Sequence, residues 1–124
     1  SGSDVYTRDI IKTNEISVTA TSGADIRIAV DAISVETNTT SGSDIEISGK
    51  AKNHASSATS GSSIDAYNLE SENVIARATS GADVNVYASK KIQASASSGG
   101  DIDFKGNPEK VTKNSSSGGS VSKK

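Results

Sequence analysis

One five-residue pattern recurs along the whole chain and limits the folds open to it. The pattern is Ser-Gly, a small residue, usually Asp, and then Ile or Val. Its copies begin at Ser1, Ser22, Ser41, Ser60, Ser80, Ser98 and, in a weaker form, Ser117. These starting numbers differ by 21, 19, 19, 20, 18 and 19 residues. Such an even spacing indicates a repeat protein in which each unit contributes one layer.

Each unit contains two stretches in which apolar and polar residues alternate, which is typical of strands with one buried face. The stretch after each turn places on one side Ile26, Ile45, Ile64, Val84 and Ile102. The stretch before the next turn aligns Ile16, Val35, His54, Val74, Ile92 and Val111. We therefore expect Ile or Val to stack on Ile or Val in successive units, with His54 as the exception.

The repeat length selects among the repeat folds. A period near 19 residues is too short for a propeller blade of about 40 residues, and the units lack the consensus and helix of a leucine-rich repeat. We predict an all-β fold, a β-solenoid of about six coils with roughly 19 residues each. Coils spaced about 4.8 Å apart would form a rod of about 30 Å.

Composition agrees with a thin solenoid interior. The chain has 124 residues with 24 Ser and 11 Gly, but only 3% aromatic residues and no Cys. Pairing between coils satisfies the backbone, so the interior needs only Ile, Val and Ala. The absence of Cys excludes disulfides, thiolate zinc sites and thiol catalysis. A dispersed net charge of −2 favours no nucleic acid, and no apolar stretch approaches the length of a membrane helix.

The repeated pattern itself predicts a sharp corner in each coil. We expect positive φ angles, which glycine adopts cheaply, at Gly23, Gly42, Gly61, Gly81 and Gly99. The aspartates two residues later are expected to accept hydrogen bonds from turn N–H groups, and they are Asp25, Asp44, Asp83 and Asp101. A calcium ladder is the alternative, but Ser63 interrupts the row and Ca²⁺ requires six to eight oxygens. We predict no metal and no cofactor.

Several segments resemble a known family. They are Ser22-Gly23-Ala24-Asp25-Ile26, Ser80-Gly81-Ala82-Asp83-Val84, Ser98-Gly99-Gly100-Asp101-Ile102-Asp103-Phe104-Lys105-Gly106-Asn107-Pro108 and Ser116-Ser117-Gly118-Gly119-Ser120-Val121. Together they resemble the C-terminal half of the bacterial head GIN domain, a family named for an auto-transporter adhesin. The Gly-Asn-Pro ending is the most specific part. The resemblance implies a right-handed parallel β-helix exported to the periplasm, the outer membrane or the extracellular medium.

The two ends of the rod differ in the sequence. We expect coils over residues 1–104 and a polar C-terminal cap and tail over 105–124, which contains Pro108 and several lysines. The first coil has no equivalent cap, and a terminal coil otherwise presents unpaired strand edges. We expect a missing N-terminal segment, a second chain or a neighbouring copy to cover it.

The outer face after the turns carries the candidate binding residues. Tyr67 and Tyr87 are expected at the same offset in adjacent coils, and beside them run Arg27, Glu46 and Asp65. Flat rings next to carboxylates suit a glycan or a surface protein. Stacking of two surface tyrosines for sheet stability explains the pair equally well.

His54 is the only histidine, and its neighbours supply no catalytic or metal partner, so we expect a structural role. The even repeat leaves no room for the long loops of polysaccharide-processing β-helix enzymes. The sequence therefore favours a non-enzymatic adhesin-like binding module of the cell envelope. A subunit that self-associates through its first coil is the alternative, and a polysaccharide-processing enzyme is the third.

Overall fold

The computed structural model describes residues 4–6 and 10–123, and in these ranges the chain forms strands and turns without a helix. The first repeat copy at Ser1 lies largely outside the described residues. The strands are β1 (Asp4–Tyr6), β2 (Ile11–Ala20), β3 (Asp25–Thr39), β4 (Asp44–Ala58), β5 (Ser63–Ala78), β6 (Asp83–Ala96), β7 (Asp101–Lys105), β8 (Lys110–Ser115) and β9 (Ser120–Lys123).

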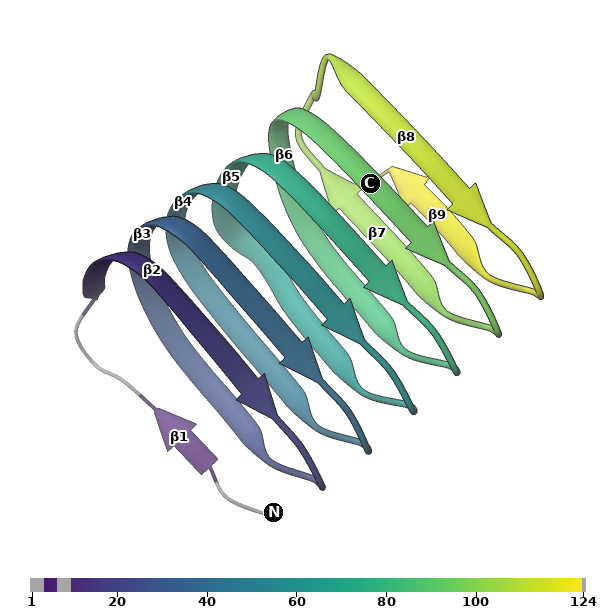
Figure 1. Ribbon diagram of the computed structural model, residues 1–124, viewed down its shortest axis with the longest axis horizontal. Coiled ribbons are helices and arrows are strands. Elements are labelled where there is room, and N and C mark those ends of the chain that lie inside the picture. Colours follow the sequence, from purple (N-terminus) through teal and green to yellow (C-terminus); the bar gives the residue numbers. More distant parts are fainter. Residues whose placement is uncertain (1–3, 7–9, 124) are drawn as a thin grey trace.

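All pairings are parallel, and they join each coil to the next, as Figure 1 shows. The two predicted stretches of a unit are continuous in β3 to β6, where one strand of 14 to 16 residues bends from one wall of the coil into the other. The prediction of an all-β solenoid of about six coils with a 19-residue spacing is confirmed.

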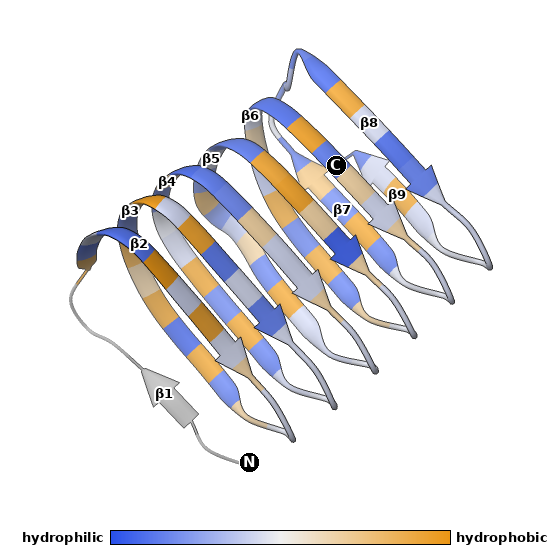
Figure 2. Ribbon diagram, viewed as in Figure 1, coloured by the Kyte–Doolittle hydropathy of each residue, from blue (hydrophilic) through white to orange (hydrophobic). Residues whose placement is uncertain are grey.

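The coil has two walls. We call the first wall β1, β7, β9 and the halves of β3 to β6 that follow the turns, because these segments pair with one another. The second wall is β2, β8 and the other halves of β3 to β6. The alternating colours along the strands in Figure 2 reflect side chains that point in turn inward and outward.

The expected apolar column lies inside the first wall. Ile26, Ile45, Ile64, Val84 and Ile102 pair in register, and the last four are at most 1% exposed. Ile26, which pairs with Val5 of β1, is only half-buried. Successive coils therefore bury the same position against the same neighbours, and small aliphatic side chains suffice.

The corners are two-residue turns in which both central residues have positive φ. The φ angles of Gly23, Gly42, Gly61, Gly81 and Gly99 lie between 74° and 79°. The preceding serines also have positive φ, between 50° and 57° for Ser22, Ser41, Ser60, Ser80 and Ser98. This combination is a type I′ turn. The pattern predicted the glycines, but not the left-handed serines.

The aspartates after the turns do not have the hydrogen-bonding role expected of them. In the second described turn, the amides of Gly42, Ser43 and Asp44 all donate to backbone carbonyls, and the later turns repeat this arrangement. Asp25, Asp44, Asp83 and Asp101 are exposed on the outer face at the start of their strands. The close spacing of the coils brings carbonyls to these amides, and they therefore do not need the carboxylates.

The coils also continue past the expected boundary at residue 105. β8 pairs with β6 and β9 pairs with β7, so residues 110–123 extend both walls in register. One lysine lies over the interior at this end of the rod. Lys113 occupies an inward position of the second wall, and its Nζ lies 5.5 Å from the centroid of the Phe104 ring. An inward-pointing charge of this kind discourages further strand addition.

Candidate functional site

The candidate residues of the first wall project from its outer face. Register places Arg27, Glu46 and Asp65 in one column, which continues through Asn85 and Asp103. Arg27 and Glu46 form an exposed ion pair, with 3.0 Å between Nε and Oε2. A shallow hollow of about 300 Å³ runs along this column between β3 and β5. Because it is solvated, the ion pair contributes little to stability.

Tyr67 and Tyr87 do not share a rung, contrary to the expected alignment. The register shifts after Ala66, so that Tyr87 pairs with Glu70, and Tyr67 falls within the irregular part of β5. A bulge of this kind re-aims the side chain that it carries. The repeat step of 20 residues between Ser60 and Ser80 was the sequence signal for an extra residue.

Charged groups gather around Tyr67. The Nζ atom of Lys105 lies 4.4 Å from the centroid of the Tyr67 ring, in the range of a cation–π contact. Burial raises the pKa of the Tyr67 phenol, and the negative charges of Asp103 and Asp65 add to the rise. Lys105 pairs in register with Tyr87, so both rings and the lysine form one patch. We call Asp65, Tyr67, Tyr87, Asp103 and Lys105 the tyrosine patch.

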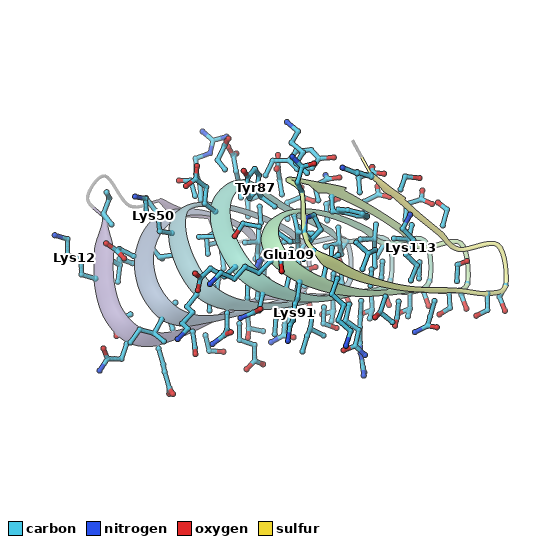
Figure 3. The ribbon with its side chains drawn as sticks, turned by 90° about the horizontal axis from the view of Figure 1, so that it is seen from above. Lys12, Lys50, Tyr87, Lys91, Glu109 and Lys113 are labelled. Atoms are coloured by element: carbon cyan, nitrogen blue, oxygen red, sulfur yellow. The ribbon has the colours of Figure 1, made fainter. Side chains whose placement is uncertain are left out.

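The second wall has an outer face that the sequence analysis did not single out. Figure 3 shows Lys91 of this wall and Tyr87 of the first wall projecting from opposite sides of the rod. Two columns of outward residues run along the second wall. The Glu15 column contains Glu15, Ser34, Asn53, Asn73, Lys91 and Lys110. The Ser17 column contains Ser17, Glu36, Ala55, Ile75, Gln93 and Thr112.

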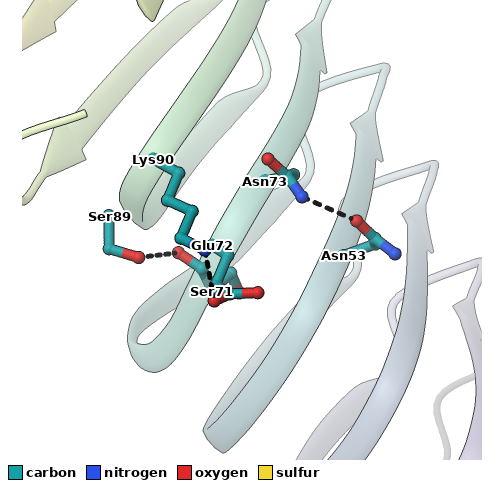
Figure 4. A network of polar contacts seen from close by, with 6 residues as sticks. All are labelled: Asn53, Ser71, Glu72, Asn73, Ser89 and Lys90. Atoms are coloured by element: carbon teal, nitrogen blue, oxygen red, sulfur yellow. Dashed lines mark hydrogen bonds and ion pairs between the residues drawn. The ribbon is translucent and has the colours of Figure 1, made fainter. Parts of the chain in front are cut away.

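Two hollows lie on this face, one on each side of Ile75. The larger, of about 650 Å³, has Glu15, Glu36 and Ala55 in its lining, and the smaller is about 330 Å³. The Asn73 amide donates to Asn53 Oδ1 at 3.0 Å across the middle of the face (Figure 4). The same view shows Lys90 paired with Glu72 at 3.0 Å nearer the bend of the coil. Aligning the outward residues of the second stretch would have found these columns in the sequence.

His54 lies inside the second wall, as the sequence predicted, and it is not part of a surface site. Its Nε2 atom lies 2.7 Å from Ser56 Oγ and 3.1 Å from Thr37 Oγ1. The imidazole is 2% exposed, and this burial lowers the pKa of His54 to about 4. The ring is therefore neutral near pH 7.

The carboxylates of the aspartate row on the first wall repel one another. Partial desolvation of its largely exposed carboxyl raises the pKa of Asp83, and the neighbouring carboxylates Asp101 and Asp103 raise it further. The hydroxyl of Ser120 donates to Asp101 Oδ1 at 2.6 Å. Among residues 4–6 and 10–123, no group of three or more His, Cys, Asp or Glu side chains is placed to hold a metal ion.

Comparison with protein families identifies the chain. The model described as "Putative auto-transporter adhesin, head GIN domain" matches residues 1–108. The chain belongs to this head GIN family. A comparison with curated protein sequences found no match.

Two solved structures share the fold seen here. One is described as a "Putative lipid binding protein" from Parabacteroides distasonis, with 20% identity, a TM-score of 0.94, and coverage of 98% of this chain and 49% of that one. The other is a "putative adhesin" from Bacteroides fragilis, with 20% identity, a TM-score of 0.91, and coverage of 98% and 56%. The chain thus spans about half the length of these structures. Among its described residues, no helix is long and apolar enough to cross a membrane.

Proposed function

We propose that this head GIN domain is an exported, non-enzymatic binding module of the cell envelope, and that the tyrosine patch recognises a glycan or a surface protein. The arrangement of the patch carries the proposal. Two half-buried rings lie on the outer face of a rigid wall, with a lysine over one ring and the carboxylates Asp65 and Asp103 in the neighbouring column. The family name and the names of the related structures agree with a binding role and with export.

The chemistry of the patch suits a polyhydroxylated ligand. An aromatic face packs against the C–H face of a sugar ring, while carboxylates accept hydrogen bonds from its hydroxyl groups. The Tyr67 hydroxyl is protonated at neutral pH, as a tyrosine ordinarily is, and its raised pKa reinforces this, so this group can donate a hydrogen bond. Because the residues belong to paired strands, their backbone loses little freedom on binding.

The connections between coils support a non-enzymatic role. The described Ser-Gly corners are tight two-residue turns, and long loops that could build a catalytic cleft are not found among the described residues. The side chains of Arg27 and Glu46 form an exposed ion pair with each other.

Binding to a glycan array provides the test, using the isolated chain and the variants Tyr67→Ala and Tyr87→Ala. We expect each alanine variant to lose at least tenfold in affinity, whereas Tyr67→Phe, which keeps the ring, should retain most of the binding. Arg77→Ala on the second wall is the matched control and should bind as the unmodified chain does. Binding that neither alanine variant changes would refute the assignment of the patch.

Self-association through the first coil is the second candidate. Ile16 of β2 is only half-buried, whereas its counterpart one coil later, Val35, is 3% exposed. A second chain that paired with β2 would bury Ile16. Light scattering across a range of concentrations tests this candidate, and a chain that stays monomeric when concentrated would exclude it.

A further inference from the structure

The outer face of the second wall is complementary to itself. The Glu15 column has an acid at the β2 end, two amides in the middle and lysines at Lys91 and Lys110 at the other end. The column has six rungs, so its midpoint lies between Asn53 and Asn73. Reversing the order of the rungs therefore places Glu15 opposite Lys110 and one amide opposite the other.

The neighbouring Ser17 column is also complementary to itself, in its shape. Its midpoint lies between Ala55 and Ile75. Ala55 borders the larger hollow, and Ile75 is a 51% exposed side chain that stands between the two hollows. Reversing the rungs therefore places the ridge of Ile75 opposite the hollow at Ala55. Glu36 then faces Gln93, and no like charges meet in either column.

We propose that two copies of this chain associate through their second walls, with the rods antiparallel and the two-fold axis parallel to the strands between β4 and β5. This surface differs from the first coil considered above, and the inference does not rest on the proposed glycan binding. A parallel arrangement, with its two-fold axis along the rod, would keep each rung opposite the same rung, so the rung of Ile75 would face itself and no lysine of these columns would lie opposite Glu15. Charge and shape thus both select the antiparallel arrangement.

The size of the face predicts a weak dimer. Six strands about 4.8 Å apart and columns about two residues apart give a contact of roughly 25 Å by 15 Å. That is below the roughly 800 Å² per partner of a standard stable interface. A dimer of this kind leaves both tyrosine patches exposed on its two outer sides, because they lie on the opposite wall.

Sedimentation of the chain over a wide concentration range provides the first test. We expect a reversible monomer–dimer equilibrium that Ile75→Asp weakens at least tenfold. Ile33→Asp is the matched control, because Ile33 is 52% exposed but lies outside both columns. Circular dichroism and thermal melting of the two variants establish that they fold. If the chain remains monomeric at all concentrations, or if Ile75→Asp dimerises as the unmodified chain does, the proposal is wrong.

The second test fixes the direction of the rods. The chain contains no Cys, so introduced thiols react without background. Across an antiparallel interface residue 15 lies about 10 Å from residue 110 of the other copy, while the two copies of residue 15 lie about 24 Å apart along the rod. A thiol cross-linker of about 10 Å should join Glu15→Cys to Lys110→Cys in a mixture, but neither variant to itself. Cross-linking of either variant alone, or none in the mixture, would overturn the antiparallel arrangement.

Charge reversal provides an independent check at low salt. Glu15→Lys and Lys110→Glu should each weaken their own homodimer, because both symmetric contacts become repulsive. Mixing the two variants should restore association, since each reversed charge then faces its opposite. If the mixture associates no better than the separate variants, the Glu15–Lys110 contact does not exist.

Discussion

The inside of the second wall is largely polar in β3 and β4 and apolar in β5 and β6, although the backbone is the same. In β3 and β4 the buried inward residues include Thr37, Thr39, His54 and Ser56. The matching positions in β5 and β6 hold Ala76, Ala78, Val74, Ile92, Ala94 and Ala96, all at most 2% exposed. Backbone pairing between coils therefore maintains the fold. The interior needs only small side chains, provided that their polar atoms have hydrogen-bond partners.

The polar part satisfies most, but not all, of its groups. Thr37, His54 and Ser56 form a triangle of contacts between 2.7 and 3.1 Å, and the hydroxyls of Ser62 and Thr39 share a hydrogen bond of 2.8 Å. Among the described residues, His54 Nδ1 and Ser43 Oγ are buried without a partner. Each such group costs about 1–3 kcal/mol. We infer that the polar coils contribute less to stability than the alanine-lined coils.

The largest expected difference between the two parts appears at acidic pH. Burial lowers the pKa of His54 to about 4, from 6.5 in an unfolded chain. Between these values the unfolded state binds the extra proton, so the free energy of unfolding falls as pH decreases from 6.5 to 4. At about 1.4 kcal/mol per pKa unit, the loss is about 3 kcal/mol. Urea denaturation at several pH values measures it.

The control for this prediction is His54→Val, because Val35 and Val74 occupy the adjacent rungs of the same column. His54 is the only histidine, so the difference between the two chains isolates its titration from that of the carboxylates. The variant should lose most of its dependence on pH between 6.5 and 4. Equal pH profiles for the two chains would mean that His54 can be protonated in the folded state at little cost.

A smaller effect on stability is expected when a hydroxyl is added to the apolar part in one variant and removed from the polar part in another. Ala78→Ser places a buried hydroxyl between Ala58 and Ala96, and we expect a loss of about 2 kcal/mol because it has no partner. The reverse change, Thr39→Val, should cost less than about 1 kcal/mol, since Ser62 Oγ still donates to the Thr59 carbonyl. Denaturant unfolding of both variants at pH 7 makes the comparison. A larger loss for Thr39→Val would contradict it.

The sequence predicted the structural features that recur in every repeat, but it missed the features that occur at only one place in the rod. The stacking of Ile45, Ile64 and Val84 and the corner glycines follow from the even spacing, because each coil poses the same packing problem. Gly49 lies at a bend outside the repeated pattern, with φ of 118°, and an added Cβ would collide with the Val30 carbonyl. The close approach of Gly49 to Val30 depends on how these two coils pack, and it could not be predicted from the local sequence.

The candidate site shows the same division. The column of Arg27, Glu46 and Asp65 was predicted correctly because these residues follow the turns at a constant offset. The shift between Tyr67 and Tyr87 was not, since the repeat step of 20 residues shows that a residue is added but not where the chain accommodates it. Side-chain contacts across coils, such as Lys105 over Tyr67, depend on that placement.

The smallest expected difference concerns the corners, which should be alike in the two parts. Gly42 and Gly81 have φ of 76° and 78°, and an added Cβ at either would meet no atom within 4 Å. Only the left-handed backbone then opposes a side chain, so Gly42→Ala and Gly81→Ala should each lose about 1 kcal/mol, with less than about 0.5 kcal/mol between them. Chemical denaturation of the two variants measures both losses. A clearly larger loss at Gly42 would mean that the polar interior weakens the turns as well, and that backbone and interior are not separable in this solenoid.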